Sequence, residues 1–161
     1  MACLVENCVI LTTMQDLQEL VCSGFSNWEQ FPTISVKTYD DLILFTYNQN
    51  AVKIGTWNWF ERVARGLLLH RKTGEVISRA FDKFFNWHET CPVPRMSSNV
   101  ENQIANVYEK LDGSLGYLFR WQGKFRFGTL GSLTSPQAVW ATEYFNTHYL
   151  HCQIPPEYTL T

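Results

Sequence analysis

A lysine stands beside a tight-turn signal about two-thirds of the way along this sequence. The run Lys110-Leu111-Asp112-Gly113-Ser114-Leu115 separates two apolar, strand-like stretches. Asp-Gly favours a turn because glycine tolerates a positive φ and aspartate can bond its own backbone. A lysine amine becomes a nucleophile only when neighbouring cations or loss of solvent lower its pKa. The run therefore allows two interpretations: amine chemistry at Lys110, or a solvated hairpin turn, which is the commoner context for Lys-x-Asp-Gly.

An α+β arrangement in a single domain over residues 1–161 is expected to position this lysine. Apolar residues at helical spacing predict a helix over 14–21, with Thr12 or Thr13 as N-cap, and Ser135-Pro136 predicts the start of another. In that second helix Trp140, Tyr144 and Phe145 form an apolar stripe, and Asn48-Gln49-Asn50 is expected to be a turn. Strands are predicted over 34–38, 42–47, 67–70, 76–80, 116–121 and 124–129.

Composition limits the classes of partner and location. A net charge of −2 gives no overall basic field, so any nucleic-acid contact must come from a local patch. The five cysteines include no C-x-x-C pair, which disfavours a zinc ribbon or a disulfide framework. His148, His151 and Cys152 are close enough in sequence to ligate a metal, but without a second cluster we interpret them as ordinary histidines and a buried thiol. No signal peptide or membrane-spanning run is visible, so a cytoplasmic location is expected.

Several short motifs occur in a fixed order around the lysine. They are Tyr39-Asp40-Asp41-Leu42-Ile43-Leu44-Phe45, Arg65-Gly66, Lys83-Phe84-Phe85-Asn86, the run at 110–115, and Gly131-Ser132. Over residues 25–140 this order and spacing resemble the amino-terminal part of the adenylyltransferase domain of the phage-type RNA ligase 1 family, in the covalent nucleotidyltransferase superfamily. The resemblance implies an antiparallel-sheet nucleotidyltransferase (ATP-grasp-like) fold that is incomplete at its carboxy-terminal end.

The resemblance also implies a reaction and its residues. Lys110 would attack the α-phosphate of ATP and form lysyl-AMP, after which RNA 5′-phosphate and 3′-hydroxyl ends would be sealed. ATP binding would involve Lys110 together with Arg65, Lys83, Phe85 and Gly113. Arg65 suits bidentate phosphate contact, and Lys83 could bind phosphate and lower the pKa of Lys110. ATP and Mg²⁺ are the implied cofactors, with no metal ligand identified.

Some roles stay open within that resemblance. Ser132 is a possible phosphate or RNA contact. Either Phe84 or Phe85 could meet the nucleotide, because adjacent residues of a strand face opposite sides, although the family pattern favours Phe85. Arg79 and Arg126 could add positive charge near the site or lie at the surface.

Two departures from the family pattern lead to an alternative function. Leu130 stands where the family commonly has a basic residue before Gly-Ser, and the later nucleotidyltransferase motifs are expected beyond Thr161, with 158–161 starting the next strand. Besides ATP and RNA ends, a carboxy-terminal half or a partner subunit is therefore a possible partner. The alternative is a degenerate or fragmentary relative that binds nucleotide or RNA ends without turnover. A purely structural domain is the third possibility.

Overall fold

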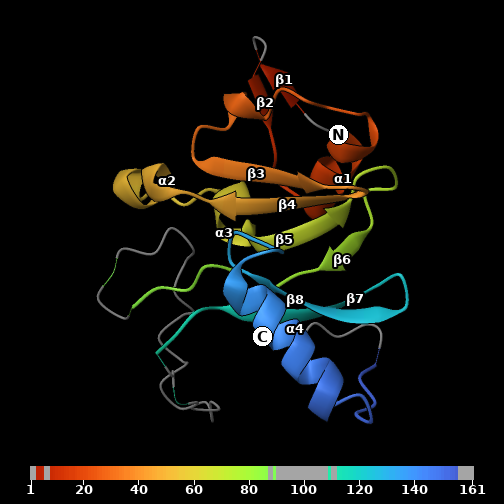
Figure 1. Ribbon diagram of the computed structural model, residues 1–161. Coiled ribbons are helices and arrows are strands. Elements are labelled where there is room, and N and C mark those ends of the chain that lie inside the picture. The colour runs from red at the N-terminus through yellow and green to blue at the C-terminus, as the bar shows by residue number, and fades with distance from the viewer. Residues whose placement is uncertain (1–2, 6–7, 87–88, 90–108, 110–111, 156–161) are drawn as a thin grey trace, which may run out of the picture.

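The computed structural model describes residues 3–5, 8–86, 89, 109 and 112–155, in which helices alternate with antiparallel strands (Figure 1). The elements are β1 (Cys3–Val5), β2 (Cys8–Ile10), α1 (Met14–Cys22), the 3₁₀ turn η1 (Trp28–Gln30), β3 (Ile34–Tyr39), β4 (Leu42–Tyr47), α2 (Gln49–Ile54), α3 (Trp59–Val63), β5 (Arg65–His70), β6 (Val76–Ser78), β7 (Gly116–Trp121), β8 (Lys124–Thr129) and α4 (Pro136–His148). This mixture confirms the α+β class.

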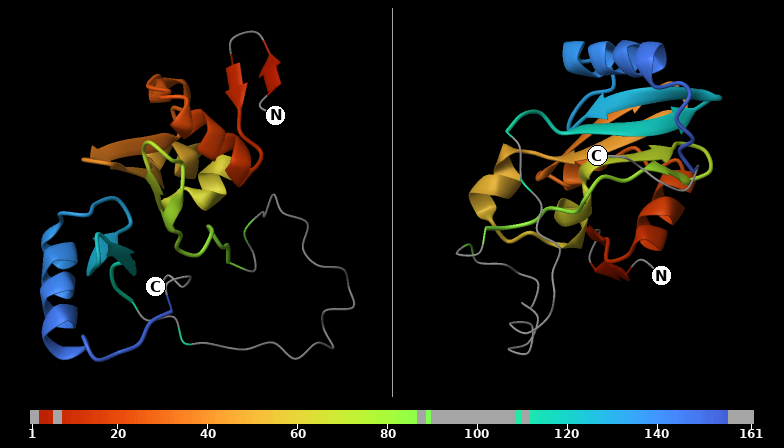
Figure 2. Two further views of the ribbon diagram at one scale, coloured as in Figure 1. Left: turned by 90° about the vertical axis from the view of Figure 1, so that its right-hand side faces the viewer. Right: turned by 90° about the horizontal axis from the view of Figure 1, so that it is seen from below.

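The elements stack in layers around a four-stranded sheet of order β3-β4-β5-β6. Helices α1 and α3 cover one face of this sheet, and the β7–β8 hairpin lies against the other. Helix α4 packs on the far side of that hairpin, as the right-hand view of Figure 2 shows. Two hydrophobic cores result, one on each face of the sheet.

Strands β4 and β5 are buried on both faces, which explains their unbroken apolar sequences. Side chains alternate along a strand, so Phe45 and Leu67 enter the core beneath α1 and α3, whereas Leu44 and Leu68 enter the core beneath the β7–β8 hairpin. Neighbouring positions of β5 from Leu67 to Leu69 therefore serve different layers.

Most predicted elements are confirmed, but Asn48-Gln49-Asn50 is not a turn. Asn48 is the N-cap of α2, where its side chain accepts a hydrogen bond from the Asn50 amide at 2.8 Å, and Gly55 ends the helix with φ of 71°. Asparagine favours turns and N-caps for the same reason, since its side chain bonds nearby backbone amides. The prediction of a turn at these three residues was therefore wrong, because the asparagine signal here begins a helix.

The expected apolar stripe of α4 is divided between two faces. Phe145 packs against Phe125 and Phe127 of β8, with ring centroids 5.4 and 5.8 Å away. Trp140 and Tyr144 instead lie on the solvent side, with 63% and 42% of their surface exposed. Only part of the stripe thus holds α4 to the hairpin.

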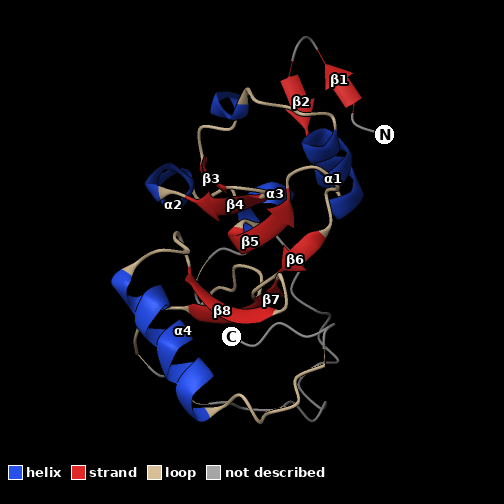
Figure 3. Cartoon of the chain, turned by 45° about the vertical axis from the view of Figure 1, so that its right-hand side comes forward, coloured by secondary structure: helices blue, strands red, loops and turns tan. Residues whose placement is uncertain are grey.

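The cartoon in Figure 3 shows β1 and β2 as a separate hairpin at one end of the molecule, which the sequence did not predict. Among the described residues, none of the helices combines the length and apolar character that a membrane span requires.

Candidate functional site

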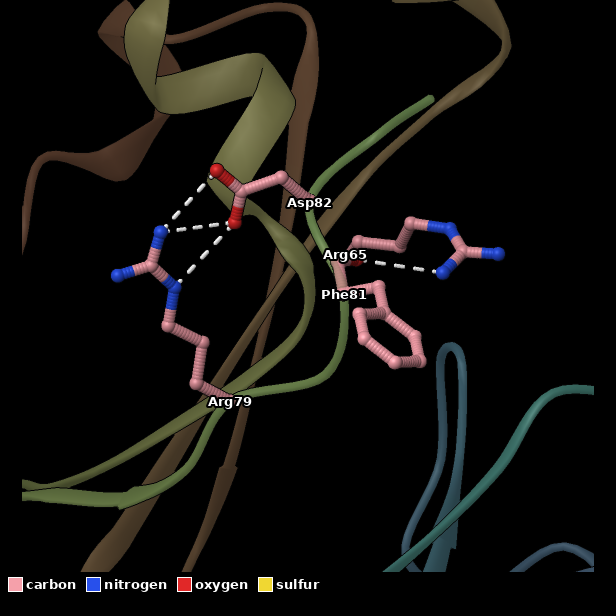
Figure 4. Close-up of polar contacts among 4 residues, drawn as sticks. All are labelled: Arg65, Arg79, Phe81 and Asp82. Carbon is pink, nitrogen blue, oxygen red and sulfur yellow. Dashed lines mark hydrogen bonds and ion pairs between the residues drawn. The ribbon is translucent and has the colours of Figure 1, made fainter. Parts of the chain in front are cut away.

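Arg65 opens strand β5 and is held by the segment that follows β6. Its Nη1 donates a hydrogen bond to the carbonyl oxygen of Phe81 at 3.2 Å, and its guanidinium carbon lies 4.9 Å from the centre of the Phe84 ring. Figure 4 shows Arg65 and Phe81 on one side of this segment. Half-buried yet open to solvent, Arg65 keeps further N–H donors for an incoming anion.

Arg79 lies on the opposite side of the same segment in Figure 4 and is paired there. Its Nη2 donates to Asp82 at 2.8 and 3.1 Å, and its Nε donates to the same carboxylate at 3.3 Å. The positive charge that the sequence offered at Arg79 is therefore neutralised by Asp82 rather than directed beside Arg65.

Lys83 is surrounded by aromatic rings. Its ammonium lies 4.4 Å from the centre of the Phe85 ring and 5.2 Å from the Trp57 ring, and it donates a hydrogen bond to the Phe84 carbonyl at 2.6 Å. The Lys83 amide donates to the Arg62 carbonyl at 2.8 Å, which fixes this residue beside the start of β5. The structure thus brings Lys83 and Phe85 together beside Trp57, and places Arg65 against Phe81 and Phe84 of the same segment.

Phe85 rather than Phe84 is turned toward Lys83 and Trp57. Phe85 is half-buried, with its ring 5.8 Å from that of Trp57, whereas Phe84 is 51% exposed beneath Arg65. The two adjacent rings therefore point to different surroundings, although residues 79–86 do not form a strand.

Trp57, which contacts Lys83 and Phe85, is a residue that sequence reasoning missed. It is buried, its ring packs edge-on against Tyr47 at 5.1 Å, and its carbonyl accepts a hydrogen bond from Arg62 at 2.9 Å. Its φ of +49° is uncommon for a bulky side chain. The only available signal was the aromatic-rich stretch between Gly55 and Phe60, which does not single out one ring.

Tyr117, on β7, links the β7–β8 hairpin to the start of β5 in the four-stranded sheet. A Cβ at Gly66, whose φ is +76°, would lie 2.7 Å from Cε1 of the tyrosine, and a Cβ at Gly128 would overlap the same ring. Burial raises the pKa of Tyr117 above its ordinary value, with a smaller contribution from Tyr39. Within the described part of the chain, its buried hydroxyl has no hydrogen-bond partner.

Lys110 and Leu111 lie outside the described residues, so the arrangement of the predicted nucleophile is not tested. Gly113 is exposed, with φ of +150° and no atom within 4 Å of where its Cβ would lie. The next residues, Ser114 and Leu115, line a groove of about 570 Å³ between the open end of the β7–β8 hairpin and the start of α4. Gly113 thus leaves its backbone accessible from solvent.

Ser132 belongs to a turn that is bound to the four-stranded sheet. Its hydroxyl accepts a hydrogen bond from the Thr134 amide at 3.1 Å, so in this structure it stabilises the turn. Thr46, which pairs with Arg65 in the sheet register, donates its hydroxyl to the Leu130 carbonyl. The turn and Arg65 are therefore neighbours across β4.

A cation lies at this turn although position 130 is leucine. The ammonium of Lys37, on β3, donates a hydrogen bond to the Gly131 carbonyl at 2.6 Å. A separation of 94 residues explains why no local pattern linked Lys37 to Gly131. Arg126, by contrast, is exposed on β8 beside the partner strand's Phe119.

Metal ligands do not gather in the part of the chain described by the structure. Among these residues there is no group of three or more histidine, cysteine, aspartate or glutamate side chains that could hold an ion, and this includes His148 and His151. Asp112 is exposed beside Gly113. The described residues therefore offer no protein cage for Mg²⁺.

The family model and two relatives that match this chain all carry RNA ligase in their descriptions. A family model described as RNA ligase, of the phage T4 ligase 1 type, matches residues 63–154. A protein of Autographa californica nuclear polyhedrosis virus named "Putative bifunctional polynucleotide kinase/RNA ligase" is 28% identical over 110 residues, covering 62% of this chain and 15% of its own length. A "Putative RNA ligase" of Thermovibrio ammonificans is 31% identical over 99 residues, covering 61% of this chain and 25% of its own. The chain thus spans a quarter or less of the relatives it matches.

Proposed function

Because the chain belongs to the RNA ligase family of the phage ligase 1 type, we propose that it forms the amino-terminal part of an ATP-dependent RNA ligase with a nucleotidyltransferase fold. The observation that supports this most directly is that the segment carrying Lys83 and Phe85 is hydrogen-bonded along the start of β5, where Arg65 lies. These two adjoining segments supply two cations, Arg65 and Lys83, and the aromatic face of Phe85. That combination suits a nucleotide with its phosphates.

The proposed first step occurs at Lys110. Its neutral amine attacks the α-phosphorus of ATP, a P–N bond forms, the bond between that phosphorus and the β-phosphate oxygen breaks, and pyrophosphate leaves. In the second step an RNA 5′-phosphate oxygen displaces the lysine from AMP. In the third, a 3′-hydroxyl attacks the RNA 5′-phosphorus and releases AMP. The protein contributes mainly by holding the reactants in line and by neutralising charge.

The roles of the supporting residues are inferred from their contacts. Arg65 uses one N–H on the Phe81 carbonyl, so other N–H groups of its fork are free to bind two phosphate oxygens. Lys83 is a point charge whose position is limited by two rings and a carbonyl. Phe85 offers a ring to the base, and Gly113 admits the nucleotide close to the backbone. Lys37 supplies the cation that Leu130 lacks beside Ser132.

Magnesium would accompany ATP rather than occupy a site built by the described residues. Mg²⁺ commonly binds through substrate phosphates with one or two carboxylates. Since the described residues form no ligand group, none of the steps above is assigned to the metal.

The test is covalent labelling of the full 161-residue chain with ATP that carries a labelled α-phosphate, in the presence of Mg²⁺. We expect label that stays on the denatured wild-type protein in alkali and is released by acid, as a P–N bond requires, and none on Lys110→Ala. Lys72→Ala is a matched control. Lys72 is an exposed lysine in the turn after β5, where it pairs with Asp41, so its replacement should leave labelling intact. Equal label on the Lys110→Ala variant would contradict the assignment of the nucleophile.

A second candidate is a relative that binds nucleotide and RNA ends without covalent turnover. The leucine at position 130, where the family commonly has a basic residue, favours it. This candidate predicts that ATP protects the chain from proteolysis while no label forms, and that Arg65→Ala or Lys83→Ala removes the protection.

A further inference from the structure

Two phenylalanine rings beside Arg65 are exposed to solvent. Phe81 has 69% of its surface exposed and Phe84 has 51%. We call these two rings, together with the guanidinium of Arg65, the Phe81–Phe84 surface. Each exposed ring leaves apolar area in water, and such patches commonly mark a binding site.

Hydrogen bonds hold this surface in place. The Phe81 carbonyl accepts from Arg65 at 3.2 Å, and the Lys83 amide between the two rings donates to the Arg62 carbonyl at 2.8 Å. The guanidinium lies over the Phe84 ring, 4.9 Å from its centre. The segment therefore presents its rings on a backbone that is fixed to α3 and β5.

The charge of the surface is positive. Arg65 provides a cation in contact with the exposed ring, while the carboxylate in this stretch, Asp82, turns away and pairs with Arg79 (Figure 4). Aromatic faces beside an arginine are the usual elements of single-strand nucleic-acid binding, because every base has a face that can stack and every phosphate carries negative charge. A protein partner would not require Arg65 to lie beside the rings while Asp82 is turned away from them.

We propose that the Phe81–Phe84 surface binds an unpaired base at the end of a single-stranded RNA. This inference rests on the proposed function and adds to it, since it assigns a substrate contact to Phe81 and Phe84, two rings that the proposed ATP site does not use. The base stacks on Phe81 or Phe84, while Arg65 keeps the contact with the ATP phosphates that the proposed function gives it. The RNA end is thereby placed beside the nucleotide cluster formed by Lys83 and Phe85.

The experiment measures binding of a fluorescent single-stranded RNA to the full chain and to the Phe81→Ala and Phe84→Leu variants. Losing a stacked ring is expected to weaken binding by about fivefold or more. Trp140→Ala is the matched control, because Trp140 is an equally exposed aromatic residue on α4, at 63%. Its affinity should stay within about twofold of wild type.

A second RNA with an abasic terminal position identifies the contact. The wild type should bind it about fivefold more weakly than the intact RNA, and the Phe81→Ala and Phe84→Leu variants should discriminate less between the two RNAs. Absence of RNA binding by the wild type, unchanged affinity in both variants, or an equal loss in Trp140→Ala would each overturn the inference. So would a loss that is the same for intact and abasic RNA.

The labelling experiment at Lys110 separates this inference from the proposed function. Label on the wild type with RNA affinity unaffected by Phe81→Ala and Phe84→Leu would reject the stacking surface alone. Base-dependent RNA binding through these rings without label would support the surface and reject the covalent step alone.

Discussion

At the scale of single residues, Trp57 combines an unfavourable backbone with favourable ring contacts. A φ of +49° costs a residue of this size about 1–2 kcal/mol. The ring packs against Tyr47 and Phe85 and faces the ammonium of Lys83, so its contacts offset that cost. Trp57 therefore acts as a positioning residue for Phe85 and Lys83.

Replacing this ring should weaken ATP use without removing the nucleophile. For Trp57→Leu we expect the ATP concentration at half-maximal labelling to rise about tenfold, because Phe85 and Lys83 would be held less firmly. A tenfold rise corresponds to a loss of about 1.4 kcal/mol of binding free energy. The maximal labelling rate should change little. The measurement is the labelling rate against ATP concentration, and Trp59→Leu, two positions along and packed on Phe60, is the control. A similar rise in both variants would indicate a general packing defect.

At the scale of elements, helix α1 depends on a reciprocal cap at its first turn. The Asp16 carboxylate accepts hydrogen bonds from the Thr13 amide at 3.0 Å and from Thr12, while the Thr13 hydroxyl accepts from the Asp16 amide. Hydrogen bonding to Thr13, and then to Thr12, holds the pKa of Asp16 well below its usual range. A carboxyl with a lowered pKa stabilises the fold above its unfolded pKa of about 3.9 and loses that effect as the pH falls further.

Because of this cap, the stability of the fold should depend on pH. Asp16→Asn is expected to lower the thermal unfolding midpoint at pH 7, since the charged acceptor is lost, and the difference from wild type should shrink at pH 3. Thermal unfolding followed by circular dichroism at pH 7, 5 and 3 measures this. A difference that stays constant over the three pH values would show that the charge of Asp16 is unimportant.

Elements with a strong local signal were predictable from the sequence, and contacts between distant elements were not. Strands β4 and β5 could be identified because burial on both faces requires continuous apolar residues, and α1 because an N-cap precedes apolar residues at helical spacing. Helix α2 was missed because Asn48 carries the same signal for a turn as for an N-cap. Within the site, family motifs gave Arg65, Lys83 and Phe85, whereas Lys37 and Trp57 depend on tertiary packing that no local pattern encodes.

At the scale of the whole molecule, the ring of Tyr117 fastens the hairpin to the four-stranded sheet. Gly66→Ala places a methyl group 2.7 Å from that ring on a backbone with positive φ, which should cost about 2–4 kcal/mol of unfolding free energy. Gly55→Ala is the control, because Gly55 has φ of +71° but no atom within 4 Å of its Cβ position. Urea unfolding of both variants measures the difference. Equal losses would show that the tyrosine ring adjusts without cost.

The turn at 130–133 has a consequence for when the site forms. Three side chains of β3 and β4 hold this turn, and the contacts made by Lys37, Thr46 and Tyr39 span 94, 84 and 94 residues. During synthesis the first hairpins of the sheet can pair early, because their contacts are close in sequence and loop closure favours such pairs. The turn can dock only after the residues up to 133 have emerged from the ribosome. The region beside Arg65 is thus completed later than the β3–β4 hairpin.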